Sequence, residues 1–355
     1  MDGVLIVAEM SANHNGSLAI AIDTVCAAKR AGADAIKLQT YTADTLTLNC
    51  AQKDFVINNG SIWDGQTFYS LYQQAYTPWE WHEEIFRVAK EEGLLCFSTP
   101  FDKTAVDFLE LLNNPIYKIA SFEITDIPLI EYAAKKMKPI VISTGIATEE
   151  DIQLAVETCY AVGNYDITLL KCTSSYPAPI EEANLCMIND LAERYKVKSG
   201  LSDHTIGSVS AIVAVTQGAK MIEKHFIIDR NIGGPDASFS MNEREFAQMV
   251  KDIRMAEAAI GSVSYELTDK MRSGRDFCRS LYVSEDMKAG EIITEQNVRS
   301  VRPGFGLHPK HLKDILGKRV NQNLEKGTRF TLEFVNKEPL TIPYVSLSTL
   351  KKDKF

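Results

Sequence analysis

The chain has 355 residues, of which 45% are hydrophobic and 24% are charged, and its formal net charge is −9 at pH 7. A chain of this length and composition folds as one large or two unequal globular domains, which excludes disordered, fibrous and collagen-like proteins. The negative net charge, without any run of basic residues, argues against nucleic acid as a partner. An anion-binding site must therefore come from a few individually placed lysines and arginines.

The cysteines and the apolar segments indicate a cytoplasmic protein. The seven cysteines are scattered without a Cys-x-x-Cys pair, a pattern that is typical of reduced thiols. The first residues enter an apolar run without a positively charged segment, so we expect no secretion signal. Because no apolar stretch approaches the roughly 18 residues of a membrane span, we also expect no membrane partner.

Eight short apolar runs, each followed by a helical pattern, dominate residues 1–261. Each run is rich in Val, Ile, Leu or Phe, as expected for parallel strands that are buried on both faces. The runs cover residues 4–11, 33–40, 94–100, 117–121, 139–145, 167–175, 198–204 and 219–226. Eight such units predict an α/β fold, a (β/α)8 TIM barrel. A doubly wound sheet is the alternative, but no Gly-x-Gly-x-x-Gly follows the first run to support it.

Capping signals mark the starts of several helices between these runs. Ser17 can begin the first helix, and Thr148 can form a capping box with Asp151. A third capping signal has Thr77 as the N-cap and Pro78 at the first helical position.

Two regions depart from the alternation of strand and helix. Residues 41–76 are too long for an ordinary loop and are rich in aromatic residues, so we expect a folded excursion over the barrel mouth, either a lid or packing on the rim. Residues 262–279 are polar and charged and are typical of a linker. Short strand-like pieces at 280–284, 291–294 and 319–320 then predict a small second domain over 280–355.

Polar side chains gather where the apolar runs end. They include Glu9, Lys37, Gln39, Thr99, Lys118, Ser121, Glu123, Ser143, Ser174, Tyr176, Ser202, Asp203, His204, Glu223 and His225. In a (β/α)8 barrel the carboxyl ends of all strands meet on the face that carries the chemistry. The sequence therefore predicts a functional barrel mouth.

Two histidines at this face suggest a metal site. His204 and His225 end neighbouring runs, so their imidazoles can share one divalent ion, with Asp203 and Glu223 nearby and oxygen ligands or water completing the set. A nitrogen and oxygen set without thiolate suits manganese or magnesium as well as zinc. The alternative is that each histidine is a satisfied core or surface residue.

Two lysines inside apolar runs suggest an anion site. Lys37 and Lys118 carry positive charge among small hydroxyl side chains, which is what a phosphate or a phosphorylated carboxylate requires. The alternative is that these lysines only form ion pairs with Glu9 and Glu123. Both can hold, because a buried lysine is costly without a partner.

The motifs that carry these residues resemble those of the sialic acid synthase family, the nonulosonic acid synthases. They cover nearly the whole chain in order: AEMSANHNG at 8–16, ADAIKLQT at 33–40, FSTPF at 97–101, YKIAS at 117–121, STG at 143–145, LSDH at 201–204, EKHF at 223–226 and VRPG at 301–304. Within the family, the chain is most similar to the pseudaminic acid synthases in YTPWEWH at 76–82, KIASFE at 118–123 and VRPGFGLHPK at 301–310.

The resemblance implies a catalytic barrel with a C-terminal antifreeze-like (SAF, β-clip) domain. It also implies a domain-swapped homodimer in which each small domain covers the active site of the partner. The family condenses phosphoenolpyruvate with an N-acetylated amino sugar and water, with C–O cleavage and release of phosphate, as a transferase. For the pseudaminic acid branch the sugar is 2,4-diacetamido-2,4,6-trideoxy-L-altrose.

Site residues follow from the resemblance by motif. The implied metal ligands are His204 and His225, with Mn²⁺ expected and Mg²⁺ or Co²⁺ as alternatives. The implied phosphoenolpyruvate contacts are Lys37, Thr99, Lys118, Ser121, Ser143, Ser174 and Ser202. The implied sugar contacts are Gln39, Glu123, Tyr176, Glu223, Asp236 and, from the other subunit, Arg302. Glu9 is expected beside the metal and the reacting carbons.

Other functions stay open at this point. An N-acetylneuraminate or legionaminate synthase would share the same catalytic set. The other candidate enzymes are the related barrel synthases that use phosphorylated sugars and the aldolases that use pyruvate, which would need a Schiff-base lysine and would release no phosphate. A catalytically dead, sugar-binding barrel is the non-enzyme alternative.

Overall fold

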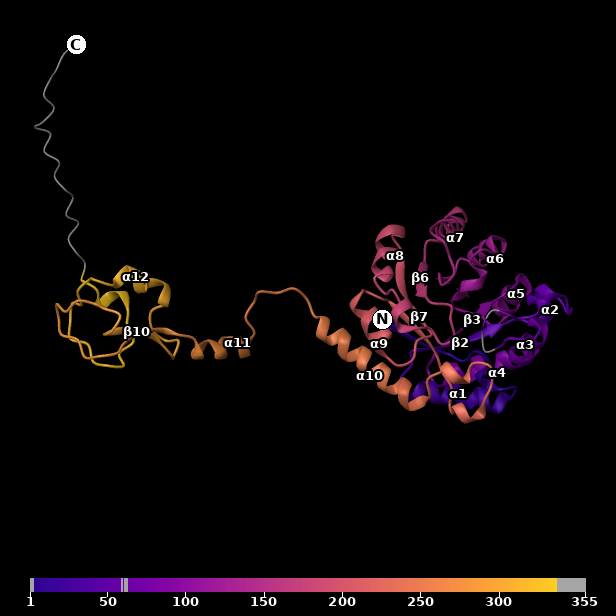
Figure 1. The fold of residues 1–355 in the computed structure, drawn as a ribbon, viewed down its shortest axis with the longest axis horizontal. Helices are drawn as coiled ribbons and strands as arrows, with labels where there is room; N and C mark the ends of the chain where they lie inside the picture. Colours follow the sequence, from indigo (N-terminus) through magenta and orange to yellow (C-terminus); the bar gives the residue numbers. More distant parts are fainter. Residues whose placement is uncertain (1–2, 59, 61–62, 337–355) are drawn as a thin grey trace, which may run out of the picture. The chain divides into compact units, whose positions relative to one another are not determined.

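The computed structural model describes residues 3–58, 60 and 63–336, which form two compact units, Met1–Gly261 and Ser262–Phe355 (Figure 1). Residues 337–355 of the predicted second domain, and 59, 61 and 62 of the predicted excursion, lie outside the described residues. None of the helices in the described part of the chain has both the length and the apolar character that a membrane crossing requires.

The first unit is a closed barrel of eight parallel strands, which confirms the predicted fold. The strands are β1 (Leu5–Glu9), β2 (Ala35–Thr40), β3 (Leu95–Pro100), β4 (Tyr117–Ile119), β5 (Ile140–Ser143), β6 (Ile167–Cys172), β7 (Lys198–Asp203) and β8 (Met221–His225). They pair in chain order, and β8 closes the barrel against β1 with Glu9 opposite His225.

Side-chain alternation along the strands builds the interior in layers. One apolar cluster is formed by Val7, Ala35, Phe97, Val141, Leu170 and Met221. Because side chains two residues apart in a strand share a face, the residues two positions later form the next layer of the same interior. These residues are Glu9, Lys37, Thr99, Ser143, Cys172 and Glu223. The predicted mouth is therefore the polar layer directly above an apolar one.

Gly200 is needed where strands crowd this interior. A Cβ at Gly200 would lie 2.3 Å from the backbone oxygen of Met221 and 2.8 Å from Leu170 Cδ2, closer than any real contact allows. The absent side chain lets β7 approach β8 and the apolar layer, and it sets the height from which Ser202 and His204 emerge.

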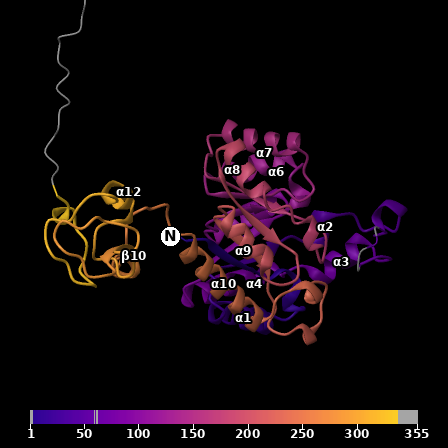
Figure 2. The same cartoon turned by 60° about the vertical axis from the view of Figure 1, so that its left-hand side comes forward.

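Helices cover the outside of the barrel (Figures 1 and 2). They are α1 (Leu18–Arg30), α4 (Trp79–Glu91), α5 (Lys103–Leu111), α6 (Ile127–Ala134), α7 (Glu149–Ala161), α8 (Met187–Tyr195), α9 (Val209–Thr216) and α10 (Glu243–Ile260). Two predicted caps are confirmed, since Ser17 accepts from the backbone N–H of Ile20 and Thr148 forms the capping box with Asp151.

The predicted cap at Thr77 is wrong. Helix α4 begins at Trp79 with Pro78 as its N-cap, and no side chain caps it. Thr77 is fully buried instead, with its Oγ1 3.1 Å from Nε2 of His14. The hydroxyl therefore contacts His14, which is distant in the sequence, and not the backbone at the start of the helix.

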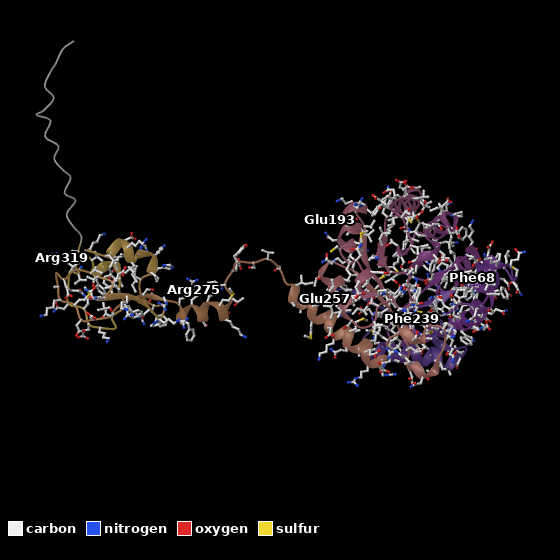
Figure 3. The ribbon with its side chains drawn as sticks, in the orientation of Figure 1. Phe68, Glu193, Phe239, Glu257, Arg275 and Arg319 are labelled. Carbon is white, nitrogen blue, oxygen red and sulfur yellow. The ribbon has the colours of Figure 1, made fainter. Side chains whose placement is uncertain are left out.

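Residues 41–76 form a folded excursion, as predicted. It contains α2 (Ala43–Leu46), the 3-10 turn η2 (Lys53–Phe55) and α3 (Phe68–Ala75). Both views of the ribbon show α2 and α3 together at one side of the barrel, and Figure 3 marks Phe68 at the start of α3. The ring of Tyr72 lies 5.8 Å from that of Tyr41, which joins the excursion to the end of β2.

The second unit has a two-stranded antiparallel sheet of β9 (Ser280–Val283) and β10 (Val298–Val301), with α12 (Leu312–Ile315). Its core is a separate cluster that includes Leu281, Val298 and Phe330. The strand at 280–284 is confirmed, but 291–294 and 319–320 form isolated bridges, and β10 was not predicted. The segment read as a linker contains a short helix, α11 (Asp269–Gly274).

Candidate active site

Four buried charged side chains form an ion-pair cluster in the polar layer. Lys37 Nζ lies 2.6 Å from Glu9 Oε2 and 3.6 Å from Glu223 Oε1, and Lys118 Nζ lies 3.2 Å from the same Glu223 oxygen. All four residues are at most 4% exposed. The four come from β1, β2, β4 and β8, so the closure of the barrel brings them together.

The partners of the two lysines differ in part from the ion pairs considered from sequence. Lys37 does pair with Glu9, but Lys118 pairs with Glu223 and not with Glu123. Although burial alone would raise it, the ammonium groups of Lys118 and Lys37 hold the pKa of Glu223 at about 2. Glu223 is therefore an ionised counter-charge for both lysines, whereas the resemblance gave it a sugar contact.

Small hydroxyl groups surround this cluster. Lys37 Nζ donates to Thr99 Oγ1 at 3.2 Å, and Ser202 Oγ donates to Glu223 Oε1 at 3.2 Å. Gln39 donates from one amide nitrogen to Glu9 Oε1 and to Ser11 Oγ, each at 3.0 Å. The cluster therefore has donors on several sides that can turn to an incoming anion.

Gly145 lies against two of the predicted serines, and a third ends the strand just before it. Its backbone N–H donates to Ser121 Oγ at 3.1 Å, and a Cβ at this position would lie 2.2 Å from Ser174 Oγ. Ser143, two residues earlier on β5, is buried and its Oγ has no hydrogen-bond partner among the described residues. A glycine is required here because the serine hydroxyls occupy the space of its side chain, and the orphaned hydroxyl of Ser143 can serve a ligand.

The two histidines predicted as metal ligands lie side by side, with ring centroids 5.4 Å apart. Nδ1 of His204 donates to the backbone oxygen of Thr173 at 2.9 Å, so Nε2 is the ring nitrogen left for a ligand. Nδ1 of His225 is buried without a hydrogen-bond partner among the described residues, 3.9 Å from Asp236 Oδ2. Burial, with the neighbouring His204, holds the pKa of His225 well below its ordinary value, so the ring is neutral as a ligand must be.

Asp203 does not lie with these histidines as a ligand. Its Oδ2 is 2.6 Å from Lys224 Nζ, and its Oδ1 accepts from the backbone and hydroxyl of Thr205. No group of three or more His, Cys, Asp or Glu side chains placed for a metal ion occurs in the described ranges. Two adjacent imidazoles, of which His225 is held neutral by burial and has an orphaned nitrogen, fit a divalent ion that takes its other ligands from substrate oxygens or water.

Aromatic rings line the side of the histidines. The ring of Tyr176 lies 4.3 Å from His204, and Phe239, labelled in Figure 3, lies 5.0 Å from His225. The ring of Trp63, from the excursion, lies 5.8 Å from Tyr176. These rings form an apolar wall that suits the face of a sugar.

Glu123 lies just after β4, in the 3-10 turn Ser121–Glu123. Burial, with a smaller contribution from Asp126, raises its pKa to about 7, and its Oε2 has no hydrogen-bond partner in the described part of the chain. A carboxyl group that titrates near neutral pH suits proton transfer or sugar binding.

Sequence reasoning missed Cys172, Phe239 and Trp63 as parts of the site. Cys172 belongs to the polar layer and its Sγ is 3.8 Å from His204 Nδ1. Its place two residues after Leu170 on the same strand face could have revealed it, whereas Phe239 and Trp63 lie in loops whose path the sequence does not show. Arg302 is exposed in the second unit, and its relation to the barrel stays a prediction.

Both units match known protein families. Residues 24–265 match the NeuB family, and residues 279–335 match the SAF domain. Pseudaminic acid synthase from Campylobacter jejuni is 49% identical over 91% of this chain and 94% of its own length. N,N'-diacetyllegionaminic acid synthase from Legionella pneumophila is 35% identical over 93% and 94%.

A solved structure shares the fold. The N-acetylneuraminic acid (sialic acid) synthetase from Leptospira borgpetersenii, in complex with citrate, superposes with a TM-score of 0.69. It is 29% identical in sequence and covers 77% of this chain and 90% of that chain.

Proposed function

Since the chain belongs to the NeuB family, we propose that it is a pseudaminic acid synthase that condenses phosphoenolpyruvate with 2,4-diacetamido-2,4,6-trideoxy-L-altrose and water. The observation that carries this proposal is the 49% identity to a pseudaminic acid synthase over nine-tenths of the chain, against 35% for a legionaminic acid synthase. The products are pseudaminic acid and inorganic phosphate, which makes the enzyme a transferase.

The ion-pair cluster supports binding of phosphoenolpyruvate. Lys37 and Lys118 share Glu223 as a counter-charge. An entering phosphate or carboxylate can therefore pair with one ammonium group while the other stays paired with Glu223, so that no buried charge is left without a partner. Thr99 and Ser202 already hydrogen-bond to this cluster, and the orphaned hydroxyl of Ser143 adds a donor. These residues would hold the enol ester in place through the reaction.

The reaction balances with one new carbon–carbon bond and one broken carbon–oxygen bond. C3 of phosphoenolpyruvate attacks the C1 aldehyde of the open-chain sugar, water adds to C2, and the C2–O bond to phosphate breaks. Glu123 has a pKa near 7 and an unpartnered oxygen, so it can accept a proton from water or from a sugar hydroxyl. Gln39 and Tyr176 would orient the sugar from either side of the mouth.

His204 and His225 would hold a divalent ion, Mn²⁺ by expectation, with Mg²⁺ and Co²⁺ as alternatives. When bound, such an ion would polarise the aldehyde oxygen for attack. His225 brings a neutral ring and an orphaned nitrogen to this role.

Assembly and location follow the same proposal. A domain-swapped homodimer would bring Arg302 of one chain to the sugar of the other, which suits an exposed arginine in a unit with its own core. Location in the cytoplasm fits seven cysteines that are all free thiols.

Phosphate release from phosphoenolpyruvate tests the function. The assay offers the diacetamido-L-altrose sugar, the D-gluco precursor of legionaminic acid and N-acetylmannosamine in parallel, each with and without a chelator. We expect metal-dependent release with the altrose sugar alone. Release only with another sugar would reassign the acceptor, and no release with any of them would favour a dead, sugar-binding barrel.

A further inference from the structure

A cavity beside the catalytic mouth has no role in the reaction described above. Its volume is about 470 Å³, within the range of small-molecule sites. It is lined by Asn15, Gly16, Trp63, Gln66, Leu71, Gln74, Gly234 and Pro235. These residues come from the loops after β1 and β8 and from the excursion after β2, so the cavity opens on the carboxyl face of the barrel.

Two contacts connect the cavity with the predicted sugar site. Trp63 lines the cavity, and its ring lies 5.8 Å from that of Tyr176. Pro235 lines it directly before Asp236, whose Oδ2 lies 3.9 Å from Nδ1 of His225. A sugar whose reacting end lies at the histidines therefore has its distal end toward this cavity.

The lining shows which chemistry the cavity accepts. None of the described residues that line it is charged, so it offers nothing to a phosphate or carboxylate. Amide side chains from Asn15, Gln66 and Gln74 alternate with the apolar surfaces of Leu71 and Pro235. A neutral group with both a hydrogen-bonding part and a methyl matches this mixture.

Gln66 provides the specific feature. Its Oε1 is buried and accepts no hydrogen bond from any described residue. Its backbone is fixed, because its oxygen accepts from Ile57 N at 2.8 Å and its N–H donates to Trp63 O at 3.2 Å. The backbone bonds fix the point from which the side chain extends, and a buried acceptor without a donor calls for a donor from the ligand.

We propose that this cavity is the subsite for the distal acetamido group of the acceptor sugar, with Gln66 Oε1 accepting its N–H and the apolar lining receiving its methyl. The inference rests on the proposed function, which supplies a sugar with two acetamido groups. It assigns to the excursion the choice between a diacetamido sugar and one with a single acetamido group. A buried acceptor left unpaired is what makes such a site discriminate.

The test compares the diacetamido sugar with an analogue that carries a hydroxyl in place of the distal acetamido group. The measured quantity is the ratio of kcat/KM for the two sugars in phosphate release. Gln66→Met removes the acceptor at nearly constant volume and should lower this ratio about tenfold. Gln73→Met is the matched control, because Gln73 is exposed on α3 and does not line the cavity. An unchanged ratio in Gln66→Met would overturn the proposal.

A second variant covers the case in which Gln66→Met fails to fold. Gly16 lines the cavity at φ 70°, where a Cβ would meet no heavy atom within 4 Å, and asparagine tolerates this conformation. Gly16→Asn therefore adds a side chain that takes up space in the cavity, and it should lower the same ratio of kcat/KM values.

Direct binding separates the two proposals. Titration calorimetry of both sugars, without phosphoenolpyruvate, should show the diacetamido sugar binding about tenfold more weakly to Gln66→Met than to the unsubstituted protein. Tight, Gln66-dependent binding without phosphate release would contradict the proposed function and keep the subsite. Turnover with equal affinities in the two proteins would overturn the subsite alone.

Discussion

Lys224 Nζ and Asp203 Oδ2 lie 2.6 Å apart, with each side chain 1% exposed, and they directly precede His225 and His204 in the chain. The two residues are also register partners of β8 and β7. The ammonium group donates further to the backbone oxygens of Thr205 and of Gly207. The ion pair thus ties together the strand ends that present the two imidazoles.

Breaking this pair should destabilise the barrel more than replacing it. Lys224→Met leaves a buried carboxylate without its partner, which costs about 3–5 kcal/mol. The double variant Asp203→Asn with Lys224→Met buries no charge and should recover a large part of that loss. Urea unfolding of the four proteins in a double-mutant cycle measures the coupling. Additive losses would show that the two side chains act independently.

Removal of one imidazole should abolish metal binding without unfolding the barrel. His225→Ala truncates a ring whose Nδ1 has no hydrogen-bond partner among the described residues, so no hydrogen bond at that atom is lost, and the barrel strands themselves are unchanged. Equilibrium dialysis with Mn²⁺ should show loss of the stoichiometric site. Phosphate release should fall at least about 100-fold, because loss of only an outer-shell partner of a metal ligand already costs about 10- to 100-fold. Full activity in this variant would contradict the metal assignment.

A buried neutral histidine should make the barrel less stable in acid. Burial lowers the pKa of His82 from 6.5 to about 4, and its Nε2 is 2.9 Å from Thr40 Oγ1. Between these pH values the unfolded chain binds the proton and the folded chain does not, so stability falls as pH decreases. The effect is about 3 kcal/mol over the whole window. His82→Gln should remove this part of the pH dependence, as measured by urea unfolding with chelator present.

Ionisation of Glu123 should change the stability of the barrel in the opposite direction, with stability falling as pH rises over a similar pH range. Burial raises its pKa from 4.5 to about 7, so the folded protein keeps the proton while the unfolded chain has released it. Asp126 adds to this rise in pKa, while a hydrogen bond from the residue's own backbone and the Lys118 ammonium oppose it. The contribution is fully present below pH 4.5 and is lost as pH rises through 7, by about 3 kcal/mol. Relative to the unsubstituted protein, Glu123→Gln should gain stability between pH 5 and pH 8.

The barrel could be predicted from the sequence because its strands are nearly all apolar. A strand such as β6 (Ile167–Cys172) is buried on both faces, and helix signals such as Ser17 separate the runs. The strand β10 escaped prediction, since Arg299 and Ser300 interrupt its apolar pattern. In so small a sheet, pairing with β9 decides the structure more than composition does.

The sequence predicted which residues lie at the site, but not which of them contact one another. The carboxyl ends of strands are visible in the sequence, whereas Lys118 and Glu223 are 105 residues apart and meet only because the barrel closes. The sequence sets Asp203 near the two histidines, but alternation along β7 turns its side chain to the other face, toward Lys224. Thr77 is a similar case, because its hydroxyl contacts the distant His14 and does not cap the helix that follows it.

The swapped dimer predicts that two inactive variants restore one another. Arg302→Ala removes the arginine from the second unit, and His225→Ala removes the metal ligand from the barrel. If each site combines the barrel of one chain with the second unit of the other, a mixed dimer contains one site with both native residues. Random co-assembly of equal amounts should then give about a quarter of native activity. Phosphate release by the co-expressed pair measures this, with each variant alone as the control. No gain on mixing would mean that Arg302 serves the barrel of its own chain or none, since within one chain no mixed dimer could contain a complete site.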